Sequence, residues 1–236
     1  MDYDLPDDLR EIQRTVREFV LAEVKPRARE WDERGEFPWP VVRKLGPLGL
    51  MGIAVPEAYG GAGMGALAAA VIIEEIARGD GSLALTVGSH NGLGTAHIAR
   101  FGTEAQKRRW LPALASGEKL AAWGLTEPGS GSDAAGMGTT AVRRGDRWIL
   151  NGSKTFITQG SVGDVFVVLA KTDVAARQHG ITAFVLEKGA KGFTQRAIHG
   201  KLGMRSSDTA ELHMEEVEVP DENRLGGLNE GFRNTL

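Results

Sequence analysis

The sequence of 236 residues contains no cysteine, which excludes disulfides, thiolate metal sites and a cysteine nucleophile. It also lacks a strong excess of charge, because a net charge of −3 gives no basic surface of the kind that nucleic-acid binding requires. No apolar run approaches the length that a membrane-spanning helix needs. We therefore expect a protein that neither binds nucleic acid nor spans a membrane.

Signals for targeting, nucleotide binding and metal binding are missing as well. The opening segment MDYDLPDDLR is acidic, whereas a signal or transit peptide is basic and apolar, so we predict a soluble, cytoplasmic protein. The glycine cluster at residues 60–65 has neither the GxGxxG spacing nor a Gly-Lys-Ser/Thr ending, and it predicts a flexible loop before a helix. His90 and His97 have no carboxylate at ligand spacing, so we interpret them as packing or surface residues and predict no metal.

The composition is that of an ordinary globular protein, with 42% hydrophobic and 25% charged residues. Up to about residue 117 the apolar residues follow a helical period. Leu9 to Val24 predicts an amphipathic helix that ends near Pro26, and further helices are expected over residues 40–48 and 66–78. Thr103 and Gln106 form a capping box that starts another helix.

Three glycines interrupt the helical pattern between residues 82 and 101. Each glycine inside a helix costs about 1 kcal/mol relative to alanine. Gly88, Gly92 and Gly94 therefore indicate either a close contact between helices or a ligand that lies against the backbone.

From Lys119 onward the period changes to the alternation typical of strands. Hairpin turns are predicted at Arg144-Gly145-Asp146 and at Asn151-Gly152. The expected strands cover residues 120–125, 139–144, 148–151, 153–157, 165–171, 181–187, 193–198 and 209–219. Eight short strands predict a small antiparallel β-barrel or sandwich. The expected fold is thus α+β and multidomain, with a helical N-terminal domain at residues 1–117 and a β-barrel domain at residues 118–226.

The stretch WGLTEPGSGSD, residues 123–133, joins the end of an apolar strand to a turn rich in glycine and serine. Such a turn leaves backbone N–H groups unpaired and open to a ligand, although by itself it is also an ordinary Pro-Gly turn. A second strand end, at Phe156 and Thr158, offers an aromatic face and a hydroxyl. Together with Thr126 these residues could flank one flat redox ring, with phosphates on the turn.

Several ordered motifs carry a resemblance to a known family: LTEPGSGSD, NGSKTFIT, KLGMRSSDT and VEVPDENRLGG, together with MGIAVPEAYGG and FGTEAQKRRWLPALASGE. Over essentially its whole length the chain is similar to the acyl-CoA dehydrogenase family of flavoproteins. This resemblance implies a helical N-terminal domain, a β-barrel middle domain and a helical C-terminal domain. It also implies FAD bound between the last two domains, and a homotetramer.

The resemblance assigns roles to particular residues. The residues implied to line the flavin are Trp123, Gly124, Leu125, Thr126, Gly131, Ser132, Phe156, Ile157 and Thr158. Phe156 stands where the family commonly has tryptophan, so the stacking face is kept and the indole N–H is missing. Ser132 is implied to lie near the pyrophosphate and the acyl-CoA, and Gln178 to face the CoA moiety, although residues 172–180 align poorly.

The chemistry implied is α,β-dehydrogenation of an acyl-CoA thioester: a carboxylate takes the α-proton, hydride passes to flavin N5, and an electron-transfer flavoprotein receives the electrons. The family's base belongs to the C-terminal domain, which would begin at residues 227–236. We therefore expect a truncated form with no assignable catalytic residue, weak flavin binding and negligible turnover. Should the chain bind FAD alone, Glu127 is the first carboxylate to test as a base.

Other functions stay open at the level of the sequence. Acyl-CoA oxidases and flavin monooxygenase components use the same scaffold, and the oxygen reactivity of the reduced flavin would separate them from dehydrogenases. A non-catalytic module that holds acyl-CoA or a partner protein is the alternative from a different class. The sequence does not determine the length of the acyl chain.

Overall fold

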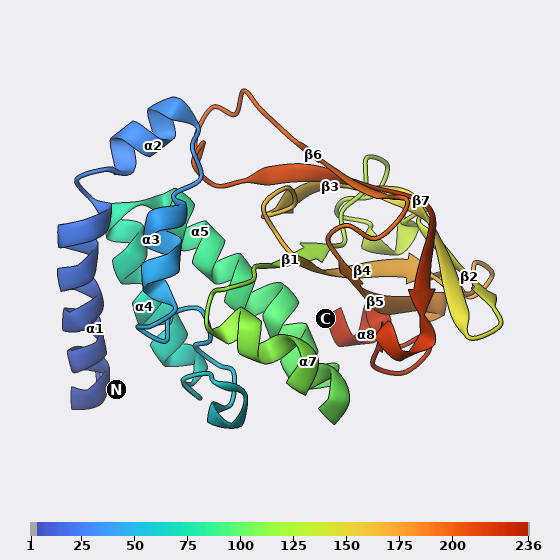
Figure 1. Cartoon of the computed structure of the whole chain (residues 1–236), viewed down its shortest axis with the longest axis horizontal. Coiled ribbons are helices and arrows are strands. Elements are labelled where there is room, and N and C mark those ends of the chain that lie inside the picture. The colour runs from blue at the N-terminus through green and yellow to red at the C-terminus, as the bar shows by residue number, and fades with distance from the viewer. Residues whose placement is uncertain (1–3, 236) are drawn as a thin grey trace.

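The structure is a computed structural model that describes residues 4–235. Helices form the N-terminal half and a twisted sheet forms the C-terminal half, and the two lie side by side (Figure 1). The helical elements are α1 (Asp7–Phe19), the π-helical turn η1 (Val20–Val24), α2 (Ala28–Arg34), α3 (Trp39–Leu45), η2 (Glu57–Tyr59), α4 (Ala66–Gly79), α5 (Gly81–Ser89), the π-helical turn η3 (His90–Thr95), α6 (Ala96–Phe101) and α7 (Glu104–Ala115).

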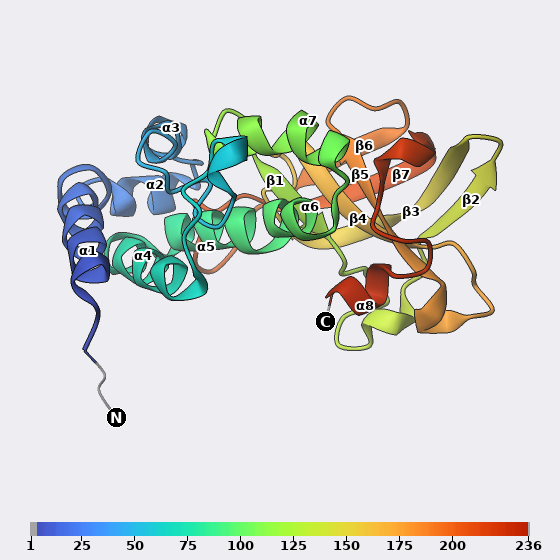
Figure 2. The same cartoon turned by 90° about the horizontal axis from the view of Figure 1, so that it is seen from below.

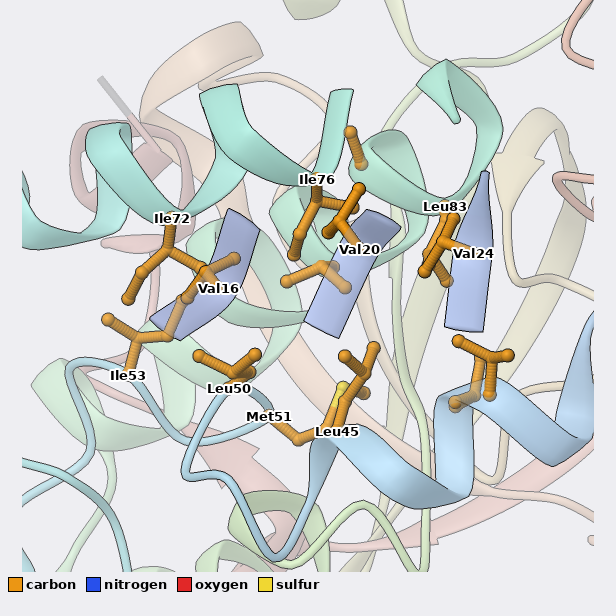
Figure 3. Close-up of a cluster of buried hydrophobic side chains, with 14 of the residues drawn as sticks. Val16, Val20, Val24, Leu45, Leu50, Met51, Ile53, Ile72, Ile76 and Leu83 are labelled. Carbon is orange, nitrogen blue, oxygen red and sulfur yellow. The ribbon is translucent and has the colours of Figure 1, made fainter. Parts of the chain in front are cut away.

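The helical half is built around the apolar face of α1 and η1. Val16, Val20 and Val24 are buried with Ile72 and Ile76 of α4 (Figure 3). The helix predicted up to Pro26 is therefore confirmed. The capping box that starts α7 is confirmed too, because the Thr103 side chain accepts from the Gln106 amide and the Gln106 side chain accepts from the Thr103 amide.

The sheet half contains β1 (Ala121–Gly124), β2 (Thr140–Arg144), β3 (Arg147–Thr158), β4 (Val165–Lys171), β5 (Ile181–Glu187), β6 (Phe193–Ala197), β7 (Thr209–Pro220) and β8 (Arg224–Leu225). The short helices η4 (Ala134–Gly136), η5 (Arg177–Gly180), η6 (Asp221–Asn223) and α8 (Gly231–Thr235) connect or follow these strands. The strand order is β6-β7-β3-β2-β4-β5-β8, and β1 pairs with β4. Figure 2 shows this half from below.

Two details of the predicted barrel are not met. The sheet ends at β6 and β8 among the described residues, so it is open and the closed barrel is not confirmed. It is also mixed, because β1 pairs with β4 in parallel and β2 has one parallel pair with β4, while the other neighbours are antiparallel. The coarser prediction, helices followed by a predominantly antiparallel sheet, is confirmed.

The hairpin predicted at Asn151-Gly152 is wrong. These residues lie inside one continuous strand, β3, at a point where the pairing with β7 shifts register. Asn151 donates to the Glu216 carboxylate at 2.7 Å and accepts from the Glu216 amide at 2.8 Å. Gly152 has a φ of +146° and packs on Thr139, where a Cβ would lie 2.5 Å from Oγ1. The Asn-Gly pair thus stabilises a bulge, whereas the turn at Gly145-Asp146 is confirmed.

β4 lies between two apolar layers, which explains its continuous apolar sequence. Val165, Val167 and Leu169 pack with helices α6 and α7, while Phe166 and Val168 face the cluster that contains residues of β3, β6 and β7. A strand buried on both faces reads as a continuous apolar run. No helix among residues 4–235 is both long and apolar enough to cross a membrane.

His90 joins the helical half to the sheet half. It is fully buried, and its Nε2 donates to the carbonyl groups of Met51 at 3.0 Å and Leu114 at 3.1 Å. Its Nδ1 accepts from the amide of Ala121, the first residue of β1, at 3.0 Å. Burial lowers the pKa of His90 to about 4, so the ring is neutral at pH 7.

Candidate functional site

The candidate site forms where β1 and β3 end beside each other. β1 ends at Gly124 and the chain continues through Leu125 to Thr126. The amide of Thr155, near the end of β3, donates to the carbonyl of Thr126 at 2.8 Å. The structure thereby brings together the two segments that the sequence singled out.

Phe156 projects into solvent from a bulge in β3. The pairing with β7 shifts between Lys154 and Ile157, and Phe156 has a φ of +57°. The residue is 69% exposed, while the neighbouring Ile157 is buried in the sheet core. A bulge redirects a side chain that regular pairing would place elsewhere. The result is an apolar ring face open to a flat ligand, whereas Ile157 is not accessible to one.

The turn after Thr126 presents unpaired backbone amides. Glu127 and Ser130 exchange backbone hydrogen bonds at 2.9 and 3.1 Å, and the Ser130 hydroxyl donates to the Asp133 carbonyl at 2.6 Å. Gly131 and Ser132 are exposed, and their amides have no acceptor among the described residues. A Cβ placed on Gly131 would meet nothing within 4 Å, so a ligand can approach the backbone. Unpaired amides of this kind suit an anionic group such as a phosphate.

A buried ion pair lies behind this turn. Lys154 Nζ donates to Glu127 Oε1 at 2.7 Å and to the Leu125 carbonyl at 3.2 Å. Lys154 is 0% exposed and Glu127 is 8% exposed. The Glu127 carboxylate also accepts from the amides of Gly138 and Thr139. Sequence reasoning missed Lys154, although both partners stand in the quoted motifs LTEPGSGSD and NGSKTFIT.

The ion pair decides how Glu127 and Lys154 titrate. Burial raises the pKa of Glu127, but the charge and hydrogen bond of Lys154, helped by hydrogen bonds from Thr139 and Gly138, outweigh it and hold that pKa below its ordinary value. Burial lowers the pKa of Lys154 to about 8, and the Glu127 carboxylate opposes this change. Because both Glu127 oxygens already accept hydrogen bonds, this carboxylate is not free to act as a base.

An apolar groove of about 480 Å³ opens beside the end of β3, between Thr158 and the α5–η3 segment. Gly88 and Gly92 line it, and a Cβ on Gly92 would meet nothing within 4 Å. Gly94 instead packs on β1, where a Cβ would lie 2.8 Å from that of Ala121. The close contact at Gly94 is thus with a strand and not with a helix, and the alternative of a ligand lying against Gly88 and Gly92 stays a prediction.

The remaining predicted residues lie around the same region. Trp123 is half-buried and its ring contacts that of His97, with centroids 4.0 Å apart and the planes tilted by 44°, so His97 has a packing role. Burial lowers the pKa of His97. Gln178 lies in η5, which contacts η4 of the Gly-Ser turn, and among the described residues its side chain hydrogen-bonds to His179 alone. Among residues 4–235 no group of three His, Asp or Glu side chains could hold a metal ion.

Comparison with known proteins identifies two consecutive matching regions. Residues 6–118 match the acyl-CoA dehydrogenase N-terminal domain, and residues 122–217 match the acyl-CoA dehydrogenase middle domain. The short-chain specific acyl-CoA dehydrogenase of Clostridium acetobutylicum is 44% identical over 232 residues, which cover 98% of this chain and 61% of that protein.

Solved structures give the same result. A structure described as the electron transferring flavoprotein of Acidaminococcus fermentans contains a chain with a TM-score of 0.96 and 42% identity, matched over 100% of this chain and 62% of that one. An acyl-CoA dehydrogenase complexed with FAD from Bacillus anthracis has a TM-score of 0.91 and 40% identity, over 98% of this chain and 40% of that one. The chain thus spans less than two thirds of the length of these relatives.

Proposed function

Because the chain belongs to the acyl-CoA dehydrogenase family, we propose that it carries the cofactor- and substrate-facing surfaces of an enzyme that dehydrogenates acyl-CoA thioesters at the α,β position. FAD is the proposed cofactor, and an electron-transfer flavoprotein is the proposed acceptor of the electrons. The observation that carries this proposal is the exposed Phe156 ring beside a turn with unpaired amides. A flat, phosphate-bearing redox cofactor matches both features.

The residues at the two strand ends fit FAD in their chemistry. Phe156 supplies an apolar face for stacking, and the amides of Gly131 and Ser132 are the proposed donors to the pyrophosphate. Thr126 and Thr158 are half-buried, and their hydroxyls form no hydrogen bond with the described residues, so they are the proposed donors to the polar edge of the ring. When bound, FAD supplies the acceptor for the hydride that leaves the β-carbon.

The apolar groove is the proposed site of the acyl chain. Its lining of Ala84, Leu85, Gly88, Leu93 and Met204 offers no charged group, and it begins at Thr158, next to the proposed flavin-facing residues. A chain of methylenes gains about 0.8 kcal/mol for each CH₂ buried in such a groove. Ser132 and Gln178, on two loops that touch through η4 and η5, are the proposed contacts for the CoA moiety.

The proposed base is a carboxylate outside this chain. Glu127 is engaged by Lys154 and two backbone amides and does not reach an open surface. The 236-residue chain by itself is therefore expected to bind acyl-CoA and FAD weakly and to turn over negligibly. A homotetramer and the division into units at residues 1–117 and 118–226 belong to the same proposal.

The proposal is tested by titrating the purified chain with FAD and recording its visible spectrum. We expect flavin bands that shift as FAD is added and that elute with the protein only when the gel-filtration buffer itself contains FAD. Added butyryl-CoA should perturb these bands without bleaching them, because Glu127, the first candidate for a base, is held by Lys154 and two backbone amides. A chain that binds no FAD at millimolar concentration would contradict the cofactor assignment. Rapid reaction of a chemically reduced complex with oxygen would favour an oxidase over a dehydrogenase.

Filling the groove should change the preference for acyl-chain length. Leucine at Gly92 extends into open space, so Gly92→Leu is expected to weaken octanoyl-CoA binding roughly 100-fold through the loss of about four methylene contacts. Butyryl-CoA binding should change less than about threefold, because its shorter chain leaves this part of the groove empty. Calorimetry with both ligands measures the effect.

The matched control is Gly65→Leu, since Gly65 also has no atom within 4 Å of its Cβ position and lies outside the groove. It should leave both affinities unchanged. Equal weakening of the two ligands by Gly92→Leu would show that the groove does not hold the acyl chain.

A further inference from the structure

Lys154 and Glu127 form a buried ion pair inside the site, and the proposed chemistry uses neither side chain. Their charged atoms lie 2.7 Å apart. Replacing a buried ion pair by apolar residues is often neutral or stabilising, because both charges have lost their hydration. Stability alone therefore does not account for this pair, and its contacts point to a geometric role.

The contacts of the pair connect three segments. Glu127 stands at the start of the Gly-Ser turn, and its carboxylate accepts from Gly138 and Thr139 at the far end, so the side chain closes residues 127–138 into a loop. Lys154 lies in β3, so its bond to Glu127 connects this loop to β3. Its second bond, to the Leu125 carbonyl, connects β3 to the end of β1. One residue beyond Lys154, the Thr155 amide binds the Thr126 carbonyl, and the next residue is Phe156.

The second part of the loop is held by the short helix η4 and by Met137, which is buried in the core, but residues 127–133, which carry the free amides, have few bonds of their own. Within residues 127–133 the backbone exchange between Glu127 and Ser130 and the bond from the Ser130 hydroxyl to the Asp133 carbonyl are the hydrogen bonds found among the described residues. The Gly131 and Ser132 amides remain free only if the loop does not collapse onto itself. Glu127 holds the two ends of the loop together through the Gly138 and Thr139 amides, and Lys154 holds Glu127 in place, so the pair prevents this collapse.

We propose that Lys154 and Glu127 are positioning residues for the FAD site: the ion pair fixes the loop of residues 127–138 against β1 and β3, so that the Gly131 and Ser132 amides and the Phe156 ring face one ligand. This inference rests on the proposed function for the identity of the ligand. The fixation of the loop itself is a property of the protein without ligand.

The first test is Lys154→Met, which keeps the length of the side chain and removes its charge. Hydrogen exchange of the Thr139 amide, measured without FAD, should accelerate at least tenfold relative to the amides of β5. FAD affinity should fall roughly 10- to 100-fold, the usual effect of losing a supporting contact behind a binding residue. Unchanged exchange at Thr139 would overturn the proposal.

A control and a double variant separate positioning from stability. Glu75→Gln breaks another ion pair of a fully buried carboxylate, with Arg17 at 2.6 Å, far from the site. It should lower the melting temperature and leave FAD affinity within about twofold, the result for an independent site. Glu127→Gln combined with Lys154→Met removes both buried charges, so stability should recover while FAD affinity stays low.

The outcomes distinguish this inference from the proposed function. If FAD affinity recovers together with stability in the double variant, the pair is merely structural and the proposal is overturned. If the unmodified chain binds no FAD, the cofactor assignment fails. The exchange rates at Thr139 in the unmodified chain and in Lys154→Met then still decide whether the pair fixes the loop.

Discussion

Replacing His90 with leucine is expected to lower the free energy of unfolding by roughly 2–5 kcal/mol, a large part of the 5–15 kcal/mol typical of a domain. The substitution leaves the Ala121 amide without its acceptor and removes the donor from the Met51 and Leu114 carbonyls, all in a fully buried place. Because these partners belong to the helical half and to β1, their loss also weakens the junction that positions the site. Chemical denaturation followed by circular dichroism measures the change.

The control is His213→Leu, since His213 is about half exposed on the sheet surface, and this variant should change stability by less than about 0.5 kcal/mol. His90→Gln should recover part of the loss, because its amide offers both a donor and an acceptor. Equal stability of His90→Leu and the unmodified protein would show that the three hydrogen bonds contribute nothing net.

The same residue predicts a dependence of stability on pH. The pKa of His90 is about 4 in the folded state because of burial, against an ordinary value of 6.5. As the pH falls from 6.5 to 4 the unfolded chain takes up a proton that the folded protein does not, so this contribution to stability decreases, by up to about 3 kcal/mol. The difference in unfolding free energy between the unmodified protein and His90→Gln should shrink over this window. A constant difference would contradict the assignment of a neutral buried imidazole.

Phe156→Ala is expected to weaken FAD binding roughly 10- to 100-fold, which corresponds to the 1.5–3 kcal/mol gained when a phenylalanine side chain is buried. The free energy of unfolding should change by less than about 0.5 kcal/mol, because Phe156 is 69% exposed. A large loss of affinity with no loss of stability is the signature of a residue that serves the ligand. Fluorescence titration with FAD and thermal denaturation measure the two quantities.

Phe156→Trp provides the complementary result. It keeps the stacking face and restores an indole N–H, so FAD binding should tighten by about three- to tenfold if that group finds an acceptor. Val142→Ala is the matched control, since Val142 is an exposed apolar residue on β2 outside the site. If Val142→Ala and Phe156→Ala had the same effect on FAD binding, the stacking role would be wrong.

The sequence predicted those features that depend on neighbours along the chain. The helix that carries Val16, Val20 and Val24, the capping box of Thr103 and Gln106, and the ranges of most strands follow from local period and hydrogen-bonding chemistry. The two segments of the candidate site were found in the same way, since a strand that ends in a Pro-Gly-Ser turn is visible in eleven consecutive residues, 123–133.

The errors and omissions involve partners far apart in the chain. Asn151-Gly152 has the local signature of a hairpin, but its conformation is decided by Glu216, 65 residues away, which binds the Asn151 side chain and stabilises a bulge. The sequence analysis assigned no role to Lys154, and only the fold buries it against Glu127, 27 residues away. Neither pairing has a local signal, because the free energy that selects it comes from long-range packing.

By itself, the sequence determined the order of helices and strands, the turn with free amides and the membership of a family. Each of these depends on residues that are close along the chain or on motifs of fixed spacing. The tertiary structure decided that the sheet is open, that β1 and β3 end side by side, that Phe156 faces outward and that His90, Lys154 and Glu127 are buried. These features depend on which apolar surfaces are buried against each other, and that is a property of the packed chain as a whole.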